Sequence, residues 1–207
     1  MPYLCSANRK KWQLHTVWNP HPFSIARCIM NKSKTPVASL WFLSHGCRQV
    51  PLEHSRNHIR WGHPDGYFLN EKGQKLAHNI SPAYLGNCHN HPAPIMRDSS
   101  KHCHILMAMA FYGERPVFTD SKGKPYVGIC HHLVPDLLNY RPANLLCWLT
   151  RSEHNIADRR QRAIQAVLPN GNLYLLPYEY LRYLQDPRTL SDEEFNQQLS
   201  YLRERKK

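Results

Sequence analysis

One segment in the second half of the chain, Tyr126–Ala163, constrains the fold more than any other because apolar runs and turn residues alternate within it. Val127–Cys130 is a short apolar run typical of a strand. Leu145–Leu149 is again apolar and aromatic, and it predicts a second strand. Loop-forming residues lie between these two runs: Pro135, Asp136, Asn139 and Pro142.

The residues after the second apolar run have the signals of a helix start. Thr150 with Glu153 three residues later forms the pattern of a capping box, which predicts a helix that runs to about Val167. His154 lies in the first turn of this helix, and Asp158 follows one turn later on the same side. The predicted helix has one largely apolar face: Ile156, Arg160, Ala163, Ile164 and Val167.

Two adjacent histidines, His131 and His132, end the first predicted strand. Folding the second strand back on the first would bring the start of the helix close to this pair. Imidazole and carboxylate side chains would then converge on one point of a strand–loop–strand–helix unit.

The polar residues of this unit resemble those of the HNH nucleases, whose site is a ββα-metal motif. In that family an apolar strand ends in Asp-His or His-His, and a loop, Asn-Leu, a Trp, a Thr and a final His or Asn follow. The chain has the same residues in the same order: His131-His132, Asn144-Leu145, Trp148, Thr150 and His154-Asn155.

The resemblance is closest to the phage and homing-type branch and covers about half of the chain. The residues His104–Pro116, HILMAMAFYGERP, resemble the His-x-Leu-Val-Ala-x-Ala-Phe segment that precedes the motif there. More weakly, Asp65–Asn79 resembles a Gly-Tyr-x-Val-Ser-x-x-Gly-x-Val module that is often fused to that branch. The chain departs from the family in two places: the loop after His132 has no Gly, and one extra residue separates Asn144 from Trp148.

The resemblance implies roles for several residues. His132 would be the general base that activates water for attack on a phosphodiester, and Asn144 would hold its ring by a hydrogen bond. His131 and His154 would bind a metal that acts as a Lewis acid. Our own inference from the helical spacing adds Asp158 as a third ligand, although it could instead pair with Arg162 one turn away.

The expected cofactor is a divalent metal ion whose identity the sequence leaves open. A nitrogen-rich ligand set favours Zn²⁺, Ni²⁺, Co²⁺ or Mn²⁺. Mg²⁺ also fits if water and phosphate oxygens supply the remaining ligands. A separate structural zinc site is a further alternative, built from a cluster of possible ligands: Cys88, His89, His91, His102 and Cys103.

The charge of the chain favours a polyanionic partner. Lys and Arg total 27 against 15 Asp and Glu, which gives a formal charge of +12. Basic residues gather on the predicted motif helix, where they would contact the phosphates of double-stranded DNA: Arg151, Arg159, Arg160 and Arg162.

We expect an α+β protein in three parts. Residues 1–60 form a basic, aromatic-rich region of unknown role, with Val37–Leu43 as one buried strand. Residues 61–168 form the nuclease-like region, with the core motif at 126–167 preceded by short strands and a helix from His104 to Phe111. Residues 169–207 form a C-terminal helical segment with helices at Tyr178–Leu184 and from a second capping box at Ser191 and Glu194 to about Arg205. The short strands are expected at Gly66–Phe68, Gln74–His78 and Ala93–Met96. The last helix has an apolar stripe suited to docking on the body of the protein or to contact in a dimer: Phe195, Leu199 and Leu202.

The hydropathy of the chain and its cysteine content indicate the cellular compartment that we expect. No apolar run is long enough to cross a membrane, and the first residues lack the apolar core of a signal peptide. The seven Cys are scattered and never form Cys-x-x-Cys, so the sequence favours a reducing cytoplasm over a secreted disulfide framework.

The sequence therefore predicts a metal-dependent HNH endonuclease that hydrolyses DNA phosphodiesters, in a phage, mobile-element or defence context. A single site cuts one strand at a time, so double-strand cleavage would need a homodimer or sequential nicks. The main rival is a non-catalytic DNA-binding protein that keeps the fold. A nuclease that acts on RNA ranks last, since no RNA-binding module is recognisable.

Overall fold

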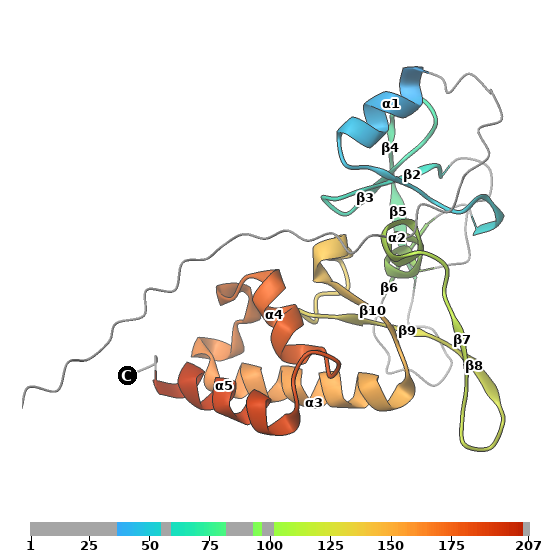
Figure 1. The fold of residues 1–207 in the computed structure, drawn as a ribbon. Helices are drawn as coiled ribbons and strands as arrows, with labels where there is room; N and C mark the ends of the chain where they lie inside the picture. The colour runs from blue at the N-terminus through green and yellow to red at the C-terminus, as the bar shows by residue number, and fades with distance from the viewer. Residues whose placement is uncertain (1–36, 55–58, 82–92, 97–101, 205–207) are drawn as a thin grey trace, which may run out of the picture. The chain divides into compact units, whose positions relative to one another are not determined.

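The computed structural model describes residues 37–54, 59–81, 93–96 and 102–204, which form helices and small antiparallel sheets (Figure 1). All of these residues lie within one compact unit, Thr35–Lys207. The first part of the chain holds α1 (Val37–Ser44), β1 (Arg48–Gln49), η1 (Leu52–His54), β2 (Trp61–His63), β3 (Tyr67–Leu69), β4 (Lys75–Leu76), β5 (His78–Ser81) and β6 (Ala93–Met96). The second part holds α2 (Cys103–Tyr112), β7 (Val117–Thr119), β8 (Pro125–Val127), β9 (Ile129–His132), η2 (Pro142–Asn144), β10 (Leu145–Leu149), α3 (Arg151–Val167), η3 (Pro169–Gly171), η4 (Leu173–Leu175), α4 (Tyr178–Gln185) and α5 (Asp192–Glu204). The predicted α+β class is confirmed.

In the part of the chain that the structure describes, the strands form one four-stranded antiparallel sheet, in the order β1-β2-β3-β4, and three two-stranded ladders. The ladders are the antiparallel pairs β5-β6, β7-β8 and β9-β10. The short strands predicted near residues 66–68, 74–78 and 93–96 are present as β3, as β4 with β5, and as β6, with ends shifted by a few residues.

The strand predicted at Val37–Leu43 is wrong, because these residues form the helix α1. Its sequence, VASLWFLS, is apolar over almost its whole length, so it carries no periodicity that would separate a strand from a short helix. The helix is also less buried than predicted. Phe42 is buried, but Leu40, Trp41 and Leu43 are exposed by 59%, 50% and 46%.

The helix α2, predicted from His104 to Phe111, packs between the four-stranded sheet and the β9-β10 ladder. Its Leu106, Met107 and Ala108 are fully buried in an apolar cluster that also contains Phe68 from β3 and Leu145 from β10. Gly62 on β2 allows the close approach, since a Cβ atom there would lie 2.9 Å from the sulfur of Met107.

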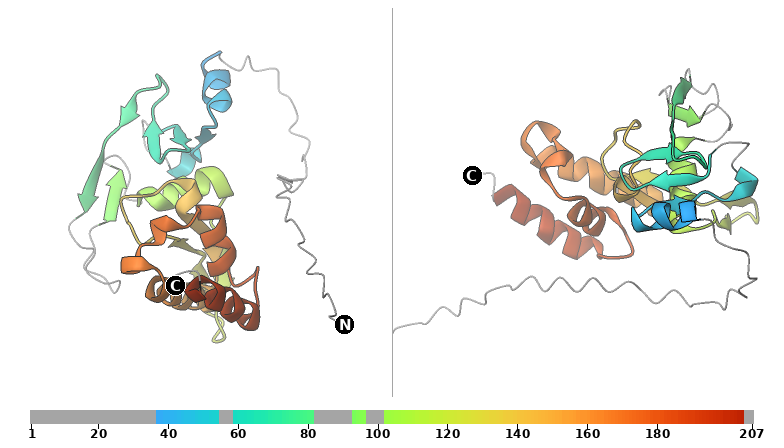
Figure 2. Two further views of the ribbon diagram at one scale, coloured as in Figure 1. Left: turned by 90° about the vertical axis from the view of Figure 1, so that its left-hand side faces the viewer. Right: turned by 90° about the horizontal axis from the view of Figure 1, so that it is seen from above.

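The C-terminal helices α4 and α5 both pack on α3 (Figures 1 and 2). The stripe predicted for docking is buried in one cluster with residues of α3 and β10: Phe195, Leu199 and Leu202. The second capping box is also present, since Ser191 N donates to Glu194 Oε2 at 2.8 Å and Glu194 N donates to Ser191 Oγ at 3.2 Å. Docking on the body is therefore confirmed for this stripe, and residues 169–204 share the core of the predicted motif.

Candidate functional site

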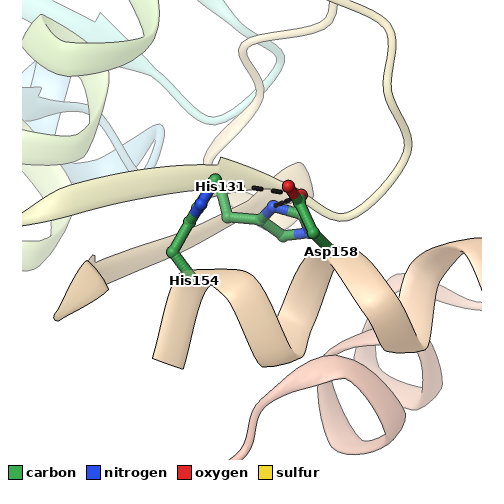
Figure 3. Close-up of side chains that lie close together, drawn as sticks. All are labelled: His131, His154 and Asp158. Atoms are coloured by element: carbon green, nitrogen blue, oxygen red, sulfur yellow. Dashed lines mark ion pairs between the residues drawn. The ribbon is translucent and has the colours of Figure 1, made fainter. Parts of the chain in front are cut away.

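Three of the predicted metal ligands, His131, His154 and Asp158, lie together where β9 meets the first two turns of α3 (Figure 3). Their candidate ligand atoms all lie within 4.8 Å of one another. Nδ1 of His131 is 3.3 Å from Oδ1 of Asp158, and Nε2 of His154 is 3.9 Å from the same oxygen. The group could hold a metal ion.

Local sequence determines where the helix of this group begins. Thr150 is the N-cap of α3: its hydroxyl accepts from Glu153 N at 3.2 Å, and Glu153 Oε2 accepts from Thr150 N at 2.7 Å. This reciprocal pair satisfies two backbone donors at the helix start. His154 therefore lies in the first turn, and Asp158 follows one turn later on the same face.

The extra residue between Asn144 and Trp148 is absorbed by an irregularity in β10. The β9-β10 register shifts between Leu146 and Leu149, and Trp148 has a positive φ of 55°. A bulge adds one residue to one strand of a pair, which keeps the flanking side chains on their faces. Leu146 and Leu149 accordingly belong to the same apolar cluster although they are three residues apart.

The donor set of the group fits a divalent cation. The hydrogen bond from His131 lowers the pKa of Asp158, which keeps its carboxylate ionised. Burial lowers the pKa of His154 by more than Asp158 raises it, so this imidazole is neutral at pH 7. Two imidazoles and one carboxylate are common ligands of Zn²⁺ and related metals, and atoms bound at about 2.1 Å to a tetrahedral ion lie about 3.4 Å apart.

His132 lies apart from this group and contacts His104 of α2, with ring centres 4.9 Å apart. Its Nε2 is buried and has no hydrogen-bond partner among the described residues. Burial, with a smaller effect from His131, lowers the pKa of His132 to about 4, so the ring is neutral at pH 7. A neutral imidazole with a free ring nitrogen can accept a proton.

Asn144 holds the loop after β9, and its hydrogen bonds differ from those predicted. Its Oδ1 accepts from Val134 N at 2.8 Å, and its Nδ2 donates to Asn139 O at 2.9 Å and to Val134 O at 3.2 Å. The side chain is fully buried, and these bonds use both of its N–H groups. Asn144 thus shapes the loop that has no Gly, and the predicted bond to the His132 ring is replaced by bonds to the backbone.

The four arginines of α3 have different surroundings. Arg160 is only 2% exposed and binds Leu190 O and Asp192 at 2.9 and 3.0 Å, so it ties α5 to α3 and the predicted DNA contact does not fit its position. Arg159 also pairs with Asp192, at 3.0 Å, and stays exposed. Arg151 stacks on Tyr126 of the β7-β8 hairpin. Arg162 is exposed.

Sequence reasoning missed two glutamines beside the group, Gln161 and Gln185. Gln161 had a usable signal, because it follows His154 and Asp158 on the same helical face. Gln185 had none in its own segment. The alternative zinc cluster lies mostly outside the described residues, since only His102 and Cys103 of its five members are described.

No protein-family model, curated protein or solved structure matches this chain. Within the described residues, the structure has no helix that is long and apolar enough to span a membrane.

Proposed function

We propose that the protein is a metal-dependent endonuclease of the HNH type that hydrolyses DNA phosphodiester bonds. The observation that carries the proposal is the His131, His154 and Asp158 group, formed by the end of a strand and the start of the helix that follows its hairpin. The order β9, loop, β10, α3 supports a ββα-metal core.

In this proposal the three side chains bind a divalent metal, which would polarise the phosphate and stabilise charge on the leaving oxygen. Asp158 supplies negative charge, and His131 and His154 each supply a ring nitrogen. His132 takes the proton from the attacking water. Its Nε2 has no hydrogen-bond partner among the described residues, so this is the ring atom available for that role. Asn144 keeps the loop after β9 in place.

The charge distribution supports a DNA substrate. The chain has a formal charge of +12, and Arg151, Arg159 and Arg162 are exposed on the helix that carries two of the proposed ligands. Contacts of such residues with phosphates would position a duplex beside the metal without reading its sequence. Arg160 takes no part, because it is buried under α5.

The rival is a DNA-binding protein without catalytic activity, and one observation favours it. Nε2 of His132 is buried, so a water molecule reaches it only after a local rearrangement. The rival predicts DNA binding without cleavage under any metal, and binding that the substitution His132→Ala leaves unchanged.

The test is nicking of supercoiled plasmid by the full chain with Mg²⁺, Mn²⁺, Ni²⁺, Co²⁺ or Zn²⁺ and after chelation. We expect metal-dependent nicking that His154→Ala abolishes. Ser152→Ala is the matched control, because Ser152 lies in the same first turn of the helix and is exposed. Absence of nicking by the wild-type chain with every metal, while it still binds DNA, would move the assignment to the rival.

A further inference from the structure

Two buried glutamines lie beside the proposed metal group. Gln161 is on α3, three residues after Asp158, and Gln185 is the last residue of α4. They are 7% and 0% exposed. A buried amide destabilises the fold if its polar atoms lose their hydrogen bonds, so the partners of these two side chains indicate what they do.

The side-chain nitrogens of both glutamines donate to backbone carbonyls at the end of β9. Gln161 Nε2 donates to His132 O at 2.6 Å and to Leu133 O at 3.0 Å. Gln185 Nε2 donates to Leu133 O at 2.9 Å. Because a carbonyl oxygen only accepts, these bonds fix which end of each amide is nitrogen.

The orientation of Gln185 in turn fixes a proton on His131. Oε1 of Gln185 lies 3.1 Å from Nε2 of His131, and because that oxygen only accepts, Nε2 must carry the hydrogen. Gln161 Nε2 is 3.4 Å from the same ring nitrogen, but its two N–H groups already have carbonyl acceptors. The other ring nitrogen, Nδ1, lies 3.3 Å from Oδ1 of Asp158. A carboxylate oxygen also only accepts, so Nδ1 donates to Asp158 until a bound metal ion takes the place of that hydrogen.

We propose that Gln185 is a positioning residue, which holds His131 as the Nε2–H tautomer so that Nδ1 is its metal-binding atom. The inference rests on the proposed function in one respect, that His131, His154 and Asp158 bind a divalent metal. Histidine ligands commonly donate their second N–H to an oxygen, and loss of that partner typically weakens metal binding about 10–100-fold. Helix α4 is then part of the site, and Gln161 anchors the strand end that carries His131.

The first experiment reads which ring nitrogen of His131 carries a hydrogen when Zn²⁺ is bound, and it needs no activity. Two-bond ¹H–¹⁵N NMR spectra of the full chain with Zn²⁺ at pH 8, where imidazoles are ordinarily neutral, distinguish a protonated ring nitrogen from one that binds the metal. The substitution His131→Ala assigns the signals. We expect Nε2–H in the wild-type chain and a loss of that preference in Gln185→Met, which keeps the side-chain length. An Nδ1–H tautomer in the wild-type chain with Zn²⁺ bound would overturn the proposal, whether or not the protein cuts DNA.

The second experiment follows the same His131 signals during titration with Zn²⁺, so that binding at other histidines does not interfere. We expect Gln185→Met to weaken binding at His131 about 10–100-fold. Gln185→Glu should restore it, because a carboxylate oxygen accepts from the same Nε2–H. Gln165→Met, a change at a half-buried position further along α3, is the control and should leave binding unchanged.

The outcomes separate this proposal from the proposed function. Equal Zn²⁺ binding by the wild-type chain and Gln185→Met contradicts the role of Gln185 and leaves the metal site standing. No effect of Zn²⁺ on His131 in the wild-type chain refutes the metal site and with it the proposed role of Gln185. If Gln185→Met fails to fold, the wild-type tautomer and the Gln185→Glu titration still decide the question.

Discussion

His131 and His132 are neighbours in the sequence, yet β9 places their rings in two different environments. Successive side chains of a strand point to opposite faces. His131 faces α3, where it meets Asp158, and it reaches Gln185 of α4. His132 faces α2, where it meets His104. We call these the α3 face and the α2 face of β9.

The two faces differ in how their polar atoms are satisfied. On the α3 face both ring nitrogens of His131 have partners. On the α2 face, Nε2 of His132 has none among the described residues and the ring lies in a largely apolar environment. In the proposed function the two faces have different roles: the α3 face binds the cation, and the α2 face holds the imidazole that accepts a proton.

The substitution with the largest expected effect on activity, at His132, separates proton transfer from metal binding. His132→Ala should lower single-turnover nicking about 10²–10⁴-fold, the usual range for loss of a general base, while metal affinity changes less than about twofold. Rates of plasmid nicking and metal titrations measure the two quantities. His63→Ala, a change of a half-buried histidine on β2, is the control and should affect neither. Loss of metal binding in His132→Ala would show that the two faces do not act separately.

A second test uses the strand opposite β9. Leu145 pairs with His132 and Leu146 pairs with His131 across the ladder, and both leucines are at most 1% exposed. Each Leu→Ala change should lower the free energy of unfolding by about 3 kcal/mol, measured in urea. Directly opposed residues share a face, so only Leu146→Ala should also weaken metal binding. Equal losses of metal binding in both variants would contradict the comparison.

A third test acts on the α3 face through the helix start. Thr150→Ala removes the N-cap hydroxyl and should cost about 1 kcal/mol of stability, with a further loss of metal affinity because His154 lies in the first turn. Thermal unfolding and metal titration measure both effects. Ser152→Ala changes an exposed residue of the same turn and should be nearly neutral. A Thr150→Ala chain as stable as the wild type would refute the capping role.

The smallest effect concerns Asp186, which follows Gln185 and caps α4. Burial raises the pKa of its carboxyl, but hydrogen bonds from Arg188 outweigh this and lower the pKa below the usual value. A lowered folded pKa stabilises the protein above the unfolded value of about 3.9, and this contribution is lost as the pH falls through the folded pKa. Asp186→Asn should therefore cost about 0.5–1 kcal/mol at pH 6 and almost nothing near pH 2. Urea unfolding at both pH values measures it, and a cost that does not depend on pH would exclude this ion pair as its source.

Local signals in the sequence predicted α3 and β10, whereas the strand predicted at Val127–Cys130 is divided between the end of β8 and the start of β9. The capping box at Thr150 and Glu153 predicted the start of α3, and the apolar face predicted its end at Val167. The run Leu145–Leu149 is present as β10. These features depend on residues within one or two turns of each other, which is why a single sequence reveals them.

The remaining features depend on contacts between distant segments. Gln185 meets His131 from 54 residues away, and the position of Arg160 under α5 depends on the loop before that helix. Asn144 has partners other than the predicted His132 ring, because the loop after β9 offers backbone groups that compete for its amide. The helix α1 was missed since its short apolar run has no period.

The most direct test of the central claim is the position of a bound metal. Anomalous diffraction from crystals of the full chain grown with Mn²⁺ locates the ion without reference to activity. We predict a peak bonded at about 2.0–2.3 Å to Nδ1 of His131, a ring nitrogen of His154 and a carboxylate oxygen of Asp158. Mn²⁺ bound elsewhere, with no ion within bonding distance of these three side chains, would contradict the proposal that they form the metal site.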